Sequence, residues 1–262
     1  MKKVCFLLIA LILSFTVRAQ QRIVLLDNFF NNEFKKNSQG ELIKFHYLWD
    51  DTDESGYSKW GAMFQQKGFS LQTLTTAPTI TDLSKASVYV IVDPDTDRET
   101  SNPNTINQKH VIAIRKFIQQ GGIVVVMAND SINADLVHLN LLTKRFGITL
   151  NADSKSKVYN DQYEMAAFQI PAGDDIFTTA KKVYLKEVSS LTLSKKAKPI
   201  LTHHKEGYTV AAVAPYGKGK IIVVGDPWFY NEYLNGRLGN NNGWDNDKAA
   251  ADLVAWIALQ CK

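Results

Sequence analysis

Cysteine is nearly absent from this chain. Only Cys5 and Cys261 occur among its 262 residues. Because we expect Cys5 to be lost with an N-terminal leader, the mature protein cannot form an intrachain disulfide, even in a compartment that permits one. A chain of this length can bury a large apolar core without such cross-links. The sequence therefore predicts a domain held together by packing alone.

Long apolar runs are also missing, except at the N-terminus. Two lysines precede the apolar run Val4–Val17, and Ala19 closes a plausible cleavage site. At roughly 14 residues, the run is shorter than the ~20 that span a bilayer. We therefore predict a signal peptide over residues 1–19, a single domain over residues 20–262, and a periplasmic or secreted protein without membrane contact after cleavage.

Excess charge of either sign is absent once the leader is removed. The whole chain carries +4 at pH 7, and residues 1–19 hold three cations and no acid, which leaves +1. A near-neutral protein has no long-range field for nucleic acid or anionic lipid. No Gly-x-Gly-x-x-Gly segment follows a strand pattern, and no Walker-type phosphate loop is present. We expect no nucleic-acid partner and no cofactor.

Short apolar runs alternate with helical patterns along the rest of the chain. The predicted strands are 23–26, 88–92, 123–127 and 220–224, and the predicted helices are 57–67, 105–120 (capped by Asn104), 134–145 and 249–259. Runs that are apolar on both faces are typical of parallel strands covered by helices. The pattern predicts an α/β fold with a doubly wound, mainly parallel sheet. Residues 152–215 are predicted to form a small β-rich elaboration of the same domain.

Four of the predicted strands end in a carboxylate or an amide. Because the carboxyl ends of parallel strands meet at one edge of a sheet, where such sheets bind ligands, these side chains should converge. The alternative is that they cap helices or shape turns. The residues that we expect along this edge are Asp27, Asp93, Asn129, Asp130 and Asp226.

Asp93 and Asp226 are each followed by proline, which stiffens the turn that presents the acid. We predict that both face a polar cleft walled by residues 29–33, 99–104 and 228–244. Amides, carboxylates and aromatic rings in these loops suit sugar hydroxyls and sugar faces, although the aromatic residues could instead pack in the core. The predicted substrate contacts are Asp27, Asn31, Glu33, His46, Asp95, Glu99, Asn102, Asn129, Trp228, Tyr230, Asn231 and Arg237.

Metal-site patterns are lacking. A rim of carboxylates has the oxygen ligands that calcium prefers, but no ligand loop of recognisable spacing occurs. His203 and His204 have no partnering acids or cysteines and are expected to form an exposed pair. His138 lies in a predicted helix, where packing is the expected role. We predict no metal.

The strand-end motifs together resemble a specific family. The chain resembles a class I glutamine amidotransferase-like domain at four groups of residues. These are Leu26–Asp27 with 30–33, 92–96 with 102–104, 128–130, and 225–228 with 230–233. In particular, it resembles the version found beside, or fused to, unsaturated rhamnogalacturonyl hydrolases of polysaccharide-degrading Bacteroidetes. The resemblance covers nearly the whole mature chain. It implies a flavodoxin-like sheet, a role in breakdown of pectin-type oligosaccharides, and an unsaturated uronyl hydrolase as partner.

The departures from that family limit what the chain can do. An amidotransferase needs a cysteine nucleophile at a strand-to-helix turn, activated by histidine. Residues 126–130 contain neither cysteine nor serine, and Cys261 lies at the wrong end of the chain. Glutamine hydrolysis is therefore excluded. The all-helical barrel of the neighbouring hydrolase has no counterpart here, so a hydrolase name could come from the neighbour alone.

Two functions stay open at this point. In the first, the protein is a glycan-directed hydrolase. One carboxyl protonates the leaving-group oxygen, and another activates water or attacks the sugar as a nucleophile. Its candidate catalytic residues are Asp93, Asp226, Asp130 and Glu232. In the second, the protein is a noncatalytic glycan-binding or assembly domain. An enzyme needs carboxyls in different environments, whereas binding needs only hydrogen-bonding groups and ring faces.

The leader generates the first testable prediction. Material exported by a Gram-negative host should begin at or near Gln20, because cleavage follows Ala19. N-terminal sequencing of the exported protein checks this, and an intact Met1 would contradict it.

Overall fold

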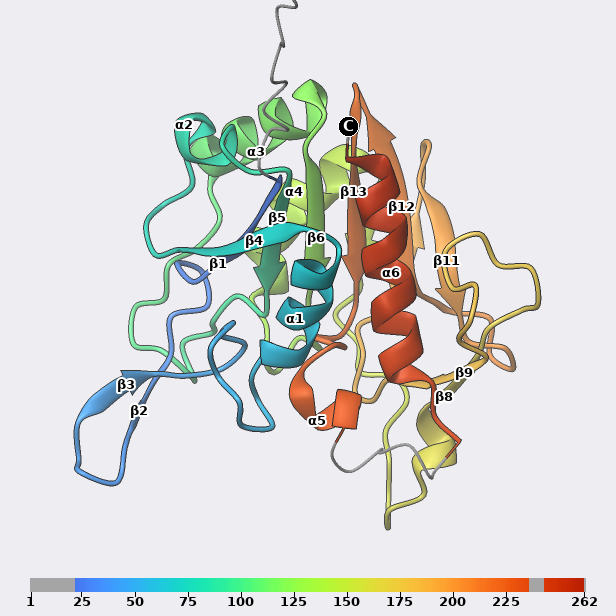
Figure 1. Cartoon of the computed structure of the whole chain (residues 1–262). Helices are drawn as coiled ribbons and strands as arrows, with labels where there is room; N and C mark the ends of the chain where they lie inside the picture. Colours follow the sequence, from blue (N-terminus) through green and yellow to red (C-terminus); the bar gives the residue numbers. More distant parts are fainter. Residues whose placement is uncertain (1–21, 236–242, 262) are drawn as a thin grey trace, which may run out of the picture.

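The computed structural model describes residues 22–235 and 243–261 (Figure 1). The predicted signal peptide and Arg237 lie outside the described residues. Within the described ranges, no helix is both long enough and apolar enough to cross a membrane.

A nine-stranded sheet forms the centre of the molecule (Figure 1). Its strands are β1 (Arg22–Asp27), β4 (Phe69–Leu74), β5 (Val88–Val92), β6 (Ile123–Met127), β7 (Ile148–Leu150), β10 (Leu191–Leu193), β11 (Lys198–Thr202), β12 (Thr209–Tyr216) and β13 (Gly219–Val224). The order is β4-β1-β5-β6-β13-β12-β10-β7, and β11 also pairs with β12. The first five strands in this order are parallel to one another, and the remaining pairs are antiparallel. The mainly parallel α/β sheet predicted from the sequence is confirmed.

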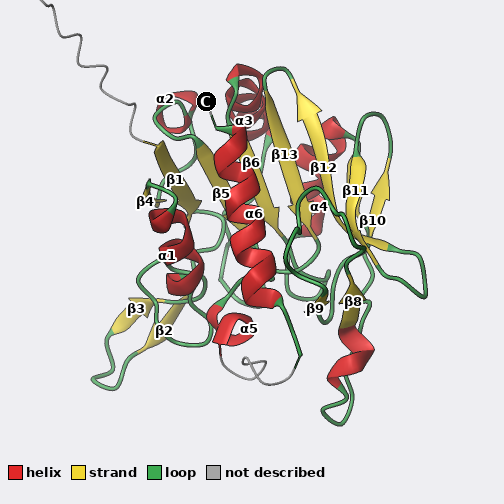
Figure 2. Cartoon of the chain, turned by 45° about the vertical axis from the view of Figure 1, so that its right-hand side comes forward, coloured by secondary structure: helices red, strands yellow, loops and turns green. Residues whose placement is uncertain are grey.

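Helices cover both faces of the parallel part (Figure 2). They are α1 (Ser58–Gln66), α2 (Ile80–Leu83), α3 (Gln108–Gln120), α4 (Leu136–Thr143), α5 (Asn231–Asn235) and α6 (Asn246–Gln260). Two apolar clusters separate the layers. Val88 and Val90 of β5 pack with α1 and α6, whereas Tyr89 and Ile91 pack with α3 and α4. Because both faces are covered, every residue of β5 and β6 is buried, which is why these strands are continuous apolar runs.

Helix starts differ from the sequence prediction. Asn107, not Asn104, caps α3, and its side chain accepts from the backbone N–H groups of Lys109 and His110. Asn104 instead donates to the Phe29 carbonyl at 2.9 Å. α6 begins at Asn246, three residues before the predicted start. Helical periodicity locates a buried face well but not the first turn, where several polar residues can serve as cap.

The β-rich elaboration predicted for 152–215 is present in two parts. β10 to β12 extend the main sheet, while β8 (Ala167–Gln169) and β9 (Lys182–Tyr184) form a separate antiparallel pair. The segment before β9 is tied to α6 by Asp252, a buried carboxylate that accepts from the backbone N–H groups of Thr179 and Ala180 at 2.8 and 3.1 Å. This part therefore belongs to the same body as the main sheet.

Three local features differ from the prediction or were missed. His203 is buried rather than exposed, and its ring stacks on Tyr208 at 4.8 Å. Desolvation accordingly lowers the pKa of His203. The edge strand β4 and the hairpin of β2 (Phe34–Lys36) and β3 (Leu42–Lys44) were not expected, because their mixed burial lacks a clear apolar run.

Gly225, which joins β13 to the rim, gives a stability prediction. A Cβ at this position would lie 1.9 Å from the Ser189 carbonyl oxygen. Because that oxygen is part of the backbone, the clash can be relieved only if the backbone moves. Gly225→Ala should therefore lower the free energy of unfolding by at least about 2 kcal/mol. Gly207→Ala is the matched control, since Gly207 has φ +74° but open space around it. It should cost only about 1–2 kcal/mol. Equal losses in urea unfolding would contradict the steric account.

Candidate functional site

The predicted convergence of strand ends is confirmed. Val92 pairs with Met127, and Met127 pairs with Val224, all in parallel register. The residues that follow these three positions therefore leave the sheet at one edge. Asp27 ends β1 at the same edge, because β1 runs parallel to β5. We call this edge the carboxyl rim, defined by Asp27, Asp93, Asn129, Asp130 and Asp226.

Two rim acids shape the backbone, as the alternative interpretation held. Asp27 is buried and accepts from the Phe30 N–H at 2.7 Å and the Tyr89 hydroxyl at 2.5 Å. Burial raises the pKa of Asp27 to about 6 despite these donors. Asp130 Oδ1 accepts from the N–H groups of Ile132 and Asn133 at 3.0 and 3.2 Å. Neither carboxyl is placed to meet a ligand directly.

Asp93 lies deeper and is less fully satisfied. Its Oδ2 accepts from the Tyr47 hydroxyl at 3.0 Å and from Asn129 Nδ2 at 3.2 Å. Its Oδ1 is buried with no hydrogen-bond partner among the described residues. Burial raises the pKa of Asp93 well above its usual range, and the negative charge of Glu99 adds to this. With φ at +37°, Asp93 also holds an uncommon backbone conformation.

Asp226 is buried against its own turn. It is 2% exposed, and its Oδ1 accepts from the Trp228 N–H at 2.6 Å. Burial raises the pKa of Asp226 to about 8, although the Trp228 N–H and the charge of Lys186 oppose the shift. Trp228 is wholly buried between neighbours such as Phe177 and Phe229. The predicted contact of Trp228 with substrate is therefore wrong for this structure, and its ring belongs to the core.

Tyrosines cover the two buried acids. Tyr47 packs against Tyr57 with ring centroids 5.4 Å apart and against Tyr230 at 6.0 Å. Tyr230 in turn packs against Tyr233 at 4.4 Å. The Tyr57 hydroxyl donates to the Pro227 carbonyl at 2.6 Å, next to Asp226. This layer separates the Asp93 and Asp226 carboxyls from solvent.

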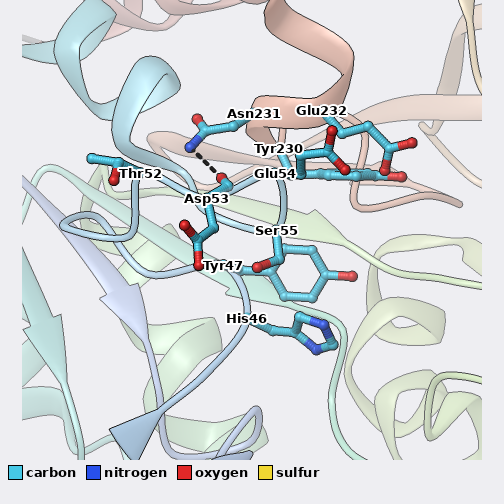
Figure 3. A pocket seen from close by; sticks show the side chains of 9 residues that line it. All are labelled: His46, Tyr47, Thr52, Asp53, Glu54, Ser55, Tyr230, Asn231 and Glu232. Carbon is cyan, nitrogen blue, oxygen red and sulfur yellow. Dashed lines mark hydrogen bonds between the residues drawn. The ribbon is translucent and has the colours of Figure 1, made fainter. Parts of the chain in front are cut away.

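A polar cavity of about 790 Å³ opens above this layer (Figure 3). Two chain segments, 46–55 and 230–232, build it. Asn231 joins them, since its Nδ2 donates to the carbonyls of Asp51 and Asp53 at 3.1 and 2.8 Å. The Glu232 N–H also donates to the Glu54 carbonyl at 2.8 Å. The lining residues are His46, Tyr47, Thr52, Asp53, Glu54, Ser55, Tyr230, Asn231 and Glu232.

The cavity wall contains a strained pair. His46 and Tyr47 are consecutive left-handed residues with φ of +59° and +54°. His46 Nδ1 lies 2.6 Å from the Glu33 carboxylate without hydrogen-bond geometry, and Asp93 accepts a hydrogen bond from the Tyr47 hydroxyl. Non-glycine residues in this region cost of order 1–3 kcal/mol each and persist only where their surroundings fix them. Asp93 therefore positions the Tyr47 side chain, and Glu33 lies beside the His46 ring at the cavity.

The walls differ from those predicted. Only the segment after β13 contributes as expected, through Tyr230, Asn231 and Glu232, and His46 also lines the cavity. Loops 29–33 and 99–104 do not line it. Their predicted contact residues have partners or roles within the protein: Asn31 donates to the Asp93 carbonyl, Glu33 lies 2.6 Å from His46 Nδ1, Glu99 accepts from the Thr96 N–H and hydroxyl, and Asn102 has a left-handed backbone. Asp95, which lies between these loops in the sequence, accepts from the Asn32 N–H.

Residues 52–55 were missed by the sequence interpretation. Their signal is the acidic and hydroxyl-rich stretch directly before the apolar face of α1. A second, smaller cavity of about 280 Å³ is lined by residues that include Asp95, Asp135 and His138. Asp135 accepts from His138 there, at 2.6 Å between Oδ2 and Nδ1.

Metal and cysteine chemistry find no support at this site. No group of three or more His, Cys, Asp or Glu within the described part of the chain could hold a metal ion. Cys261 ends α6 close to Arg22, the first residue of β1, and so lies at the opposite edge from the carboxyl rim. Burial raises the pKa of its thiol to about 11, which disfavours a thiolate.

A sequence profile described as "Domain of unknown function (DUF4350)" matches residues 50–243. The chain belongs to this family. The matched segment contains cavity residues 52–55 and 230–232, but not His46 and Tyr47. No curated protein matches the chain.

Solved structures share the fold at low sequence identity. The chain is similar to the "mmIFT52 N-terminal domain", with a TM-score of 0.65, 16% identity, and coverage of 90% of this chain and 96% of that one. It is also similar to "Cytoplasmic Protein STM1381" from Salmonella typhimurium LT2, with a TM-score of 0.55, 10% identity, and coverage of 92% and 98%. At such identities these matches describe the fold and not the activity.

Asp226 yields a prediction on pH. Its folded pKa of about 8 lies above the value near 3.9 of an unfolded aspartate, so the folded state binds more protons between these values. The contribution of Asp226 to stability is therefore greatest below about pH 4 and is lost as pH rises to about 8. Asp226→Asn, which keeps an acceptor for the Trp228 N–H, should raise the free energy of unfolding at pH 9 by at least about 2 kcal/mol.

Urea unfolding of the wild type and the variant across this pH range checks the prediction. The difference in free energy of unfolding between the variant and the wild type should shrink toward pH 4. The measurement at pH 4 is the internal control. A variant that is less stable at pH 9 would show that the ionised carboxylate supports the fold.

Proposed function

We propose that this protein is a noncatalytic carbohydrate-binding domain and that the cavity built by residues 46–55 and 230–232 is its binding site. The observation that carries the proposal is the combination of aromatic rings and polar groups in one open cavity of about 790 Å³. That volume lies within the range of small-molecule sites, roughly 300–1,000 Å³.

The lining has the chemistry that a sugar needs. Tyr47 and Tyr230 supply rings for the apolar face of a pyranose, and they meet edge to face with an interplanar angle of 79°. The Thr52 hydroxyl can donate and accept, the Ser55 hydroxyl already donates to the Asp51 carboxylate at 3.2 Å and can accept, and the carboxylates of the cavity accept from sugar hydroxyls. The Asn231 amide is not part of this set, because it is already bonded to the protein.

Burial of the rim acids favours binding over hydrolysis. A general acid must reach the atom that it protonates. The two carboxyls with strongly raised pKa values, Asp93 and Asp226, are only 5% and 2% exposed and lie under the tyrosines. They suit a supporting role and not a catalytic one.

A hydrolase is the second candidate function. Of the catalytic residues predicted from the sequence, only Glu232 would take part in it. Glu54 and Glu232 line the same cavity, and their backbones are hydrogen-bonded to each other. Two carboxylates beside one sugar are the minimum that glycoside hydrolysis requires. Release of product from a bound oligosaccharide would favour this alternative.

The narrower proposals rest on the resemblance to amidotransferase-like domains. These are an exported protein, a role in breakdown of pectin-type glycans, and an unsaturated uronyl hydrolase as partner. The mainly parallel α/β sheet and the missing nucleophile at 128–130 are compatible with an amidotransferase-like fold that lacks amidotransferase chemistry. The acids in the cavity oppose a uronate, so a pectin-type ligand would have to bind through its uncharged sugars.

Tyr230 provides the test. Tyr230→Ala removes a ring face and should weaken oligosaccharide binding at least about tenfold, or 1.4 kcal/mol. Tyr230→Phe keeps the ring and should retain most of the affinity. Calorimetric titration with neutral, uronate-containing and amino-sugar oligosaccharides, beside a melting curve for each variant, measures this.

The matched control is Tyr159→Ala, which removes an exposed tyrosine that does not line the cavity. Its affinity should equal that of the wild type. The proposal fails if no oligosaccharide binds, or if Tyr159→Ala and Tyr230→Ala weaken binding equally.

A further inference from the structure

Exposed lysines gather at one end of the central sheet. β1, β4, β5, β6 and β13 are parallel, so all five strands begin at the edge opposite to the carboxyl rim. We call this end the basic edge. It is defined by six exposed lysines from six different segments of the chain, namely Lys67, Lys85, Lys116, Lys144, Lys195 and Lys218.

Hydrogen bonds fix the first two of these lysines at the start of β1 and β5. Arg22, the first residue of β1, donates from Nη2 to the Lys67 carbonyl at 2.5 Å. The Ser87 N–H, two residues after Lys85, donates to the Ile23 carbonyl of β1 at 2.9 Å. Both lysines therefore lie where the parallel strands begin.

Contacts on the other side of the sheet bring the remaining segments to the same edge. The Lys218 N–H donates to a carbonyl in the last turn of α3, the helix of Lys116, at 3.1 Å. The ring of Phe146, in the short helix η1 (Lys144–Phe146), packs against Tyr216 at 5.3 Å. Lys195 Nζ in turn lies 3.4 Å from the carbonyl oxygen at the start of η1.

Acids are nearly missing from the basic edge. Asp82 of α2 is the one acid in the described segments that form it, and it accepts from the Thr79 hydroxyl at 2.6 Å. The segments are 66–69, 79–87, 115–123, 141–148, 193–197, 215–220 and 257–261. The acids of the carboxyl rim lie at the opposite end. Positive and negative charges are therefore segregated in a chain whose net charge is near zero.

Helix dipoles offset only part of this charge. α1, α3, α4 and α6 end at the basic edge, and each helix C-terminus carries about half a negative charge, or about two charges in total. The six lysines and Arg22 outnumber Asp82 by six charges. Compensation of the dipoles therefore does not account for most of the lysines.

An exposed aliphatic side chain lies on the same edge. Leu259, in the last turn of α6, is 81% exposed, more than any other large apolar side chain of the described residues. Arg22 Nη1 donates to the Ala258 carbonyl at 3.3 Å, which places Leu259 near the start of β1. Figure 1 shows the C-terminus, α2 and the turn between β12 and β13 at the same upper end of the molecule.

This combination fits a flat polyanion with an apolar interior. Neither of the two cavities described above is lined by any of the six lysines, so the cations form a surface and not a pocket. An anionic bilayer attracts clustered lysines and also accepts an aliphatic side chain below its headgroups. Nucleic acid or a polyuronate would leave Leu259 in water. Because charges are screened within ~10 Å at 0.1 M salt, a bilayer in contact with the basic edge is shielded from acids at the far end.

We propose that this protein binds anionic phospholipid bilayers through its basic edge, with Leu259 entering the acyl layer. The proposal departs from the expectation of no membrane contact, which rested on net charge and so could not show where the charges lie. It does not depend on carbohydrate binding. The cavity built by residues 46–55 and 230–232 lies at the opposite end and stays open to solvent in this orientation.

Vesicle flotation with the mature chain tests the proposal. One set of vesicles is phosphatidylcholine alone, and the other contains about a third phosphatidylglycerol. The protein should bind the anionic vesicles at least about tenfold tighter than the neutral ones. Added salt should weaken the binding, because it screens the charges.

A triple variant assigns the binding to the basic edge. Lys116→Gln, Lys144→Gln and Lys218→Gln together should weaken binding to anionic vesicles at least about tenfold. A melting curve shows that the variant is folded.

The matched control for charge replaces three exposed lysines outside the basic edge, with Lys36→Gln, Lys157→Gln and Lys205→Gln. It changes the net charge by the same amount and should leave the affinity for anionic vesicles within about twofold of the wild type.

A second pair of variants tests the aliphatic contact. Leu259→Ala should weaken binding to anionic vesicles several-fold, since the side chain no longer enters the acyl layer. Val137→Ala is its control, because Val137 is 76% exposed but lies in the first turn of α4, away from the basic edge. It should leave the affinity unchanged.

Three results would overturn the proposal. The first is equal binding, or no binding, to the two kinds of vesicle. The second is an equal loss in the two lysine triple variants. The third is that duplex DNA or polygalacturonate binds as tightly as the anionic vesicles while Leu259→Ala has no effect, which would make the basic edge a general site for polyanions.

Discussion

The in-register parallel pairing of β1, β5, β6 and β13 is the constraint on which the rest of the structure depends. It brings the ends of four buried strands to one edge, so that acids far apart in the sequence become neighbours. Because helices cover both faces of the sheet, these acids are buried. Burial raises the pKa of Asp27 and Asp226, and the carboxyls must find their hydrogen bonds within the protein. The acids of the carboxyl rim therefore support the fold and are not exposed to a ligand.

The cavity depends on the carboxyl rim indirectly, through a side chain that a rim acid positions. Asp93 accepts from the Tyr47 hydroxyl, and Tyr47 and its left-handed neighbour His46 form one wall. Asn231 then fixes the opposite wall to the backbone of 51–53. The surface exposed to a ligand consists of tyrosine rings and carboxylates that are not the rim acids. In the proposed function, binding and support are therefore assigned to two different sets of acids.

Sequence patterns predicted the features that depend on neighbouring residues in the chain, namely the buried strands and the sheet edge at which they end. Strands apolar on both faces were located to the residue for 88–92 and 123–127, and the polar residues after them marked the correct edge. β4 escaped prediction because it lies at the sheet edge, with only part of its surface buried. The cavity could not be predicted, since its walls meet through hydrogen bonds between residues about 180 positions apart, such as Asn231 and Asp51. The expected substrate contact of Trp228 was wrong for a related reason: whether an aromatic side chain lies in the core or the cleft depends on its tertiary neighbours. The signal peptide and the exported location stay predictions.

The most direct test of the account is a crystal structure of the mature protein with an oligosaccharide bound. The account predicts a sugar ring against Tyr230 or Tyr47, with its polar groups within hydrogen-bonding distance of Glu54 or Glu232 and no contact with Asp93 or Asp226. A sugar bound instead in the smaller cavity beside Asp95 and His138, or in direct contact with the rim carboxyls, would contradict it.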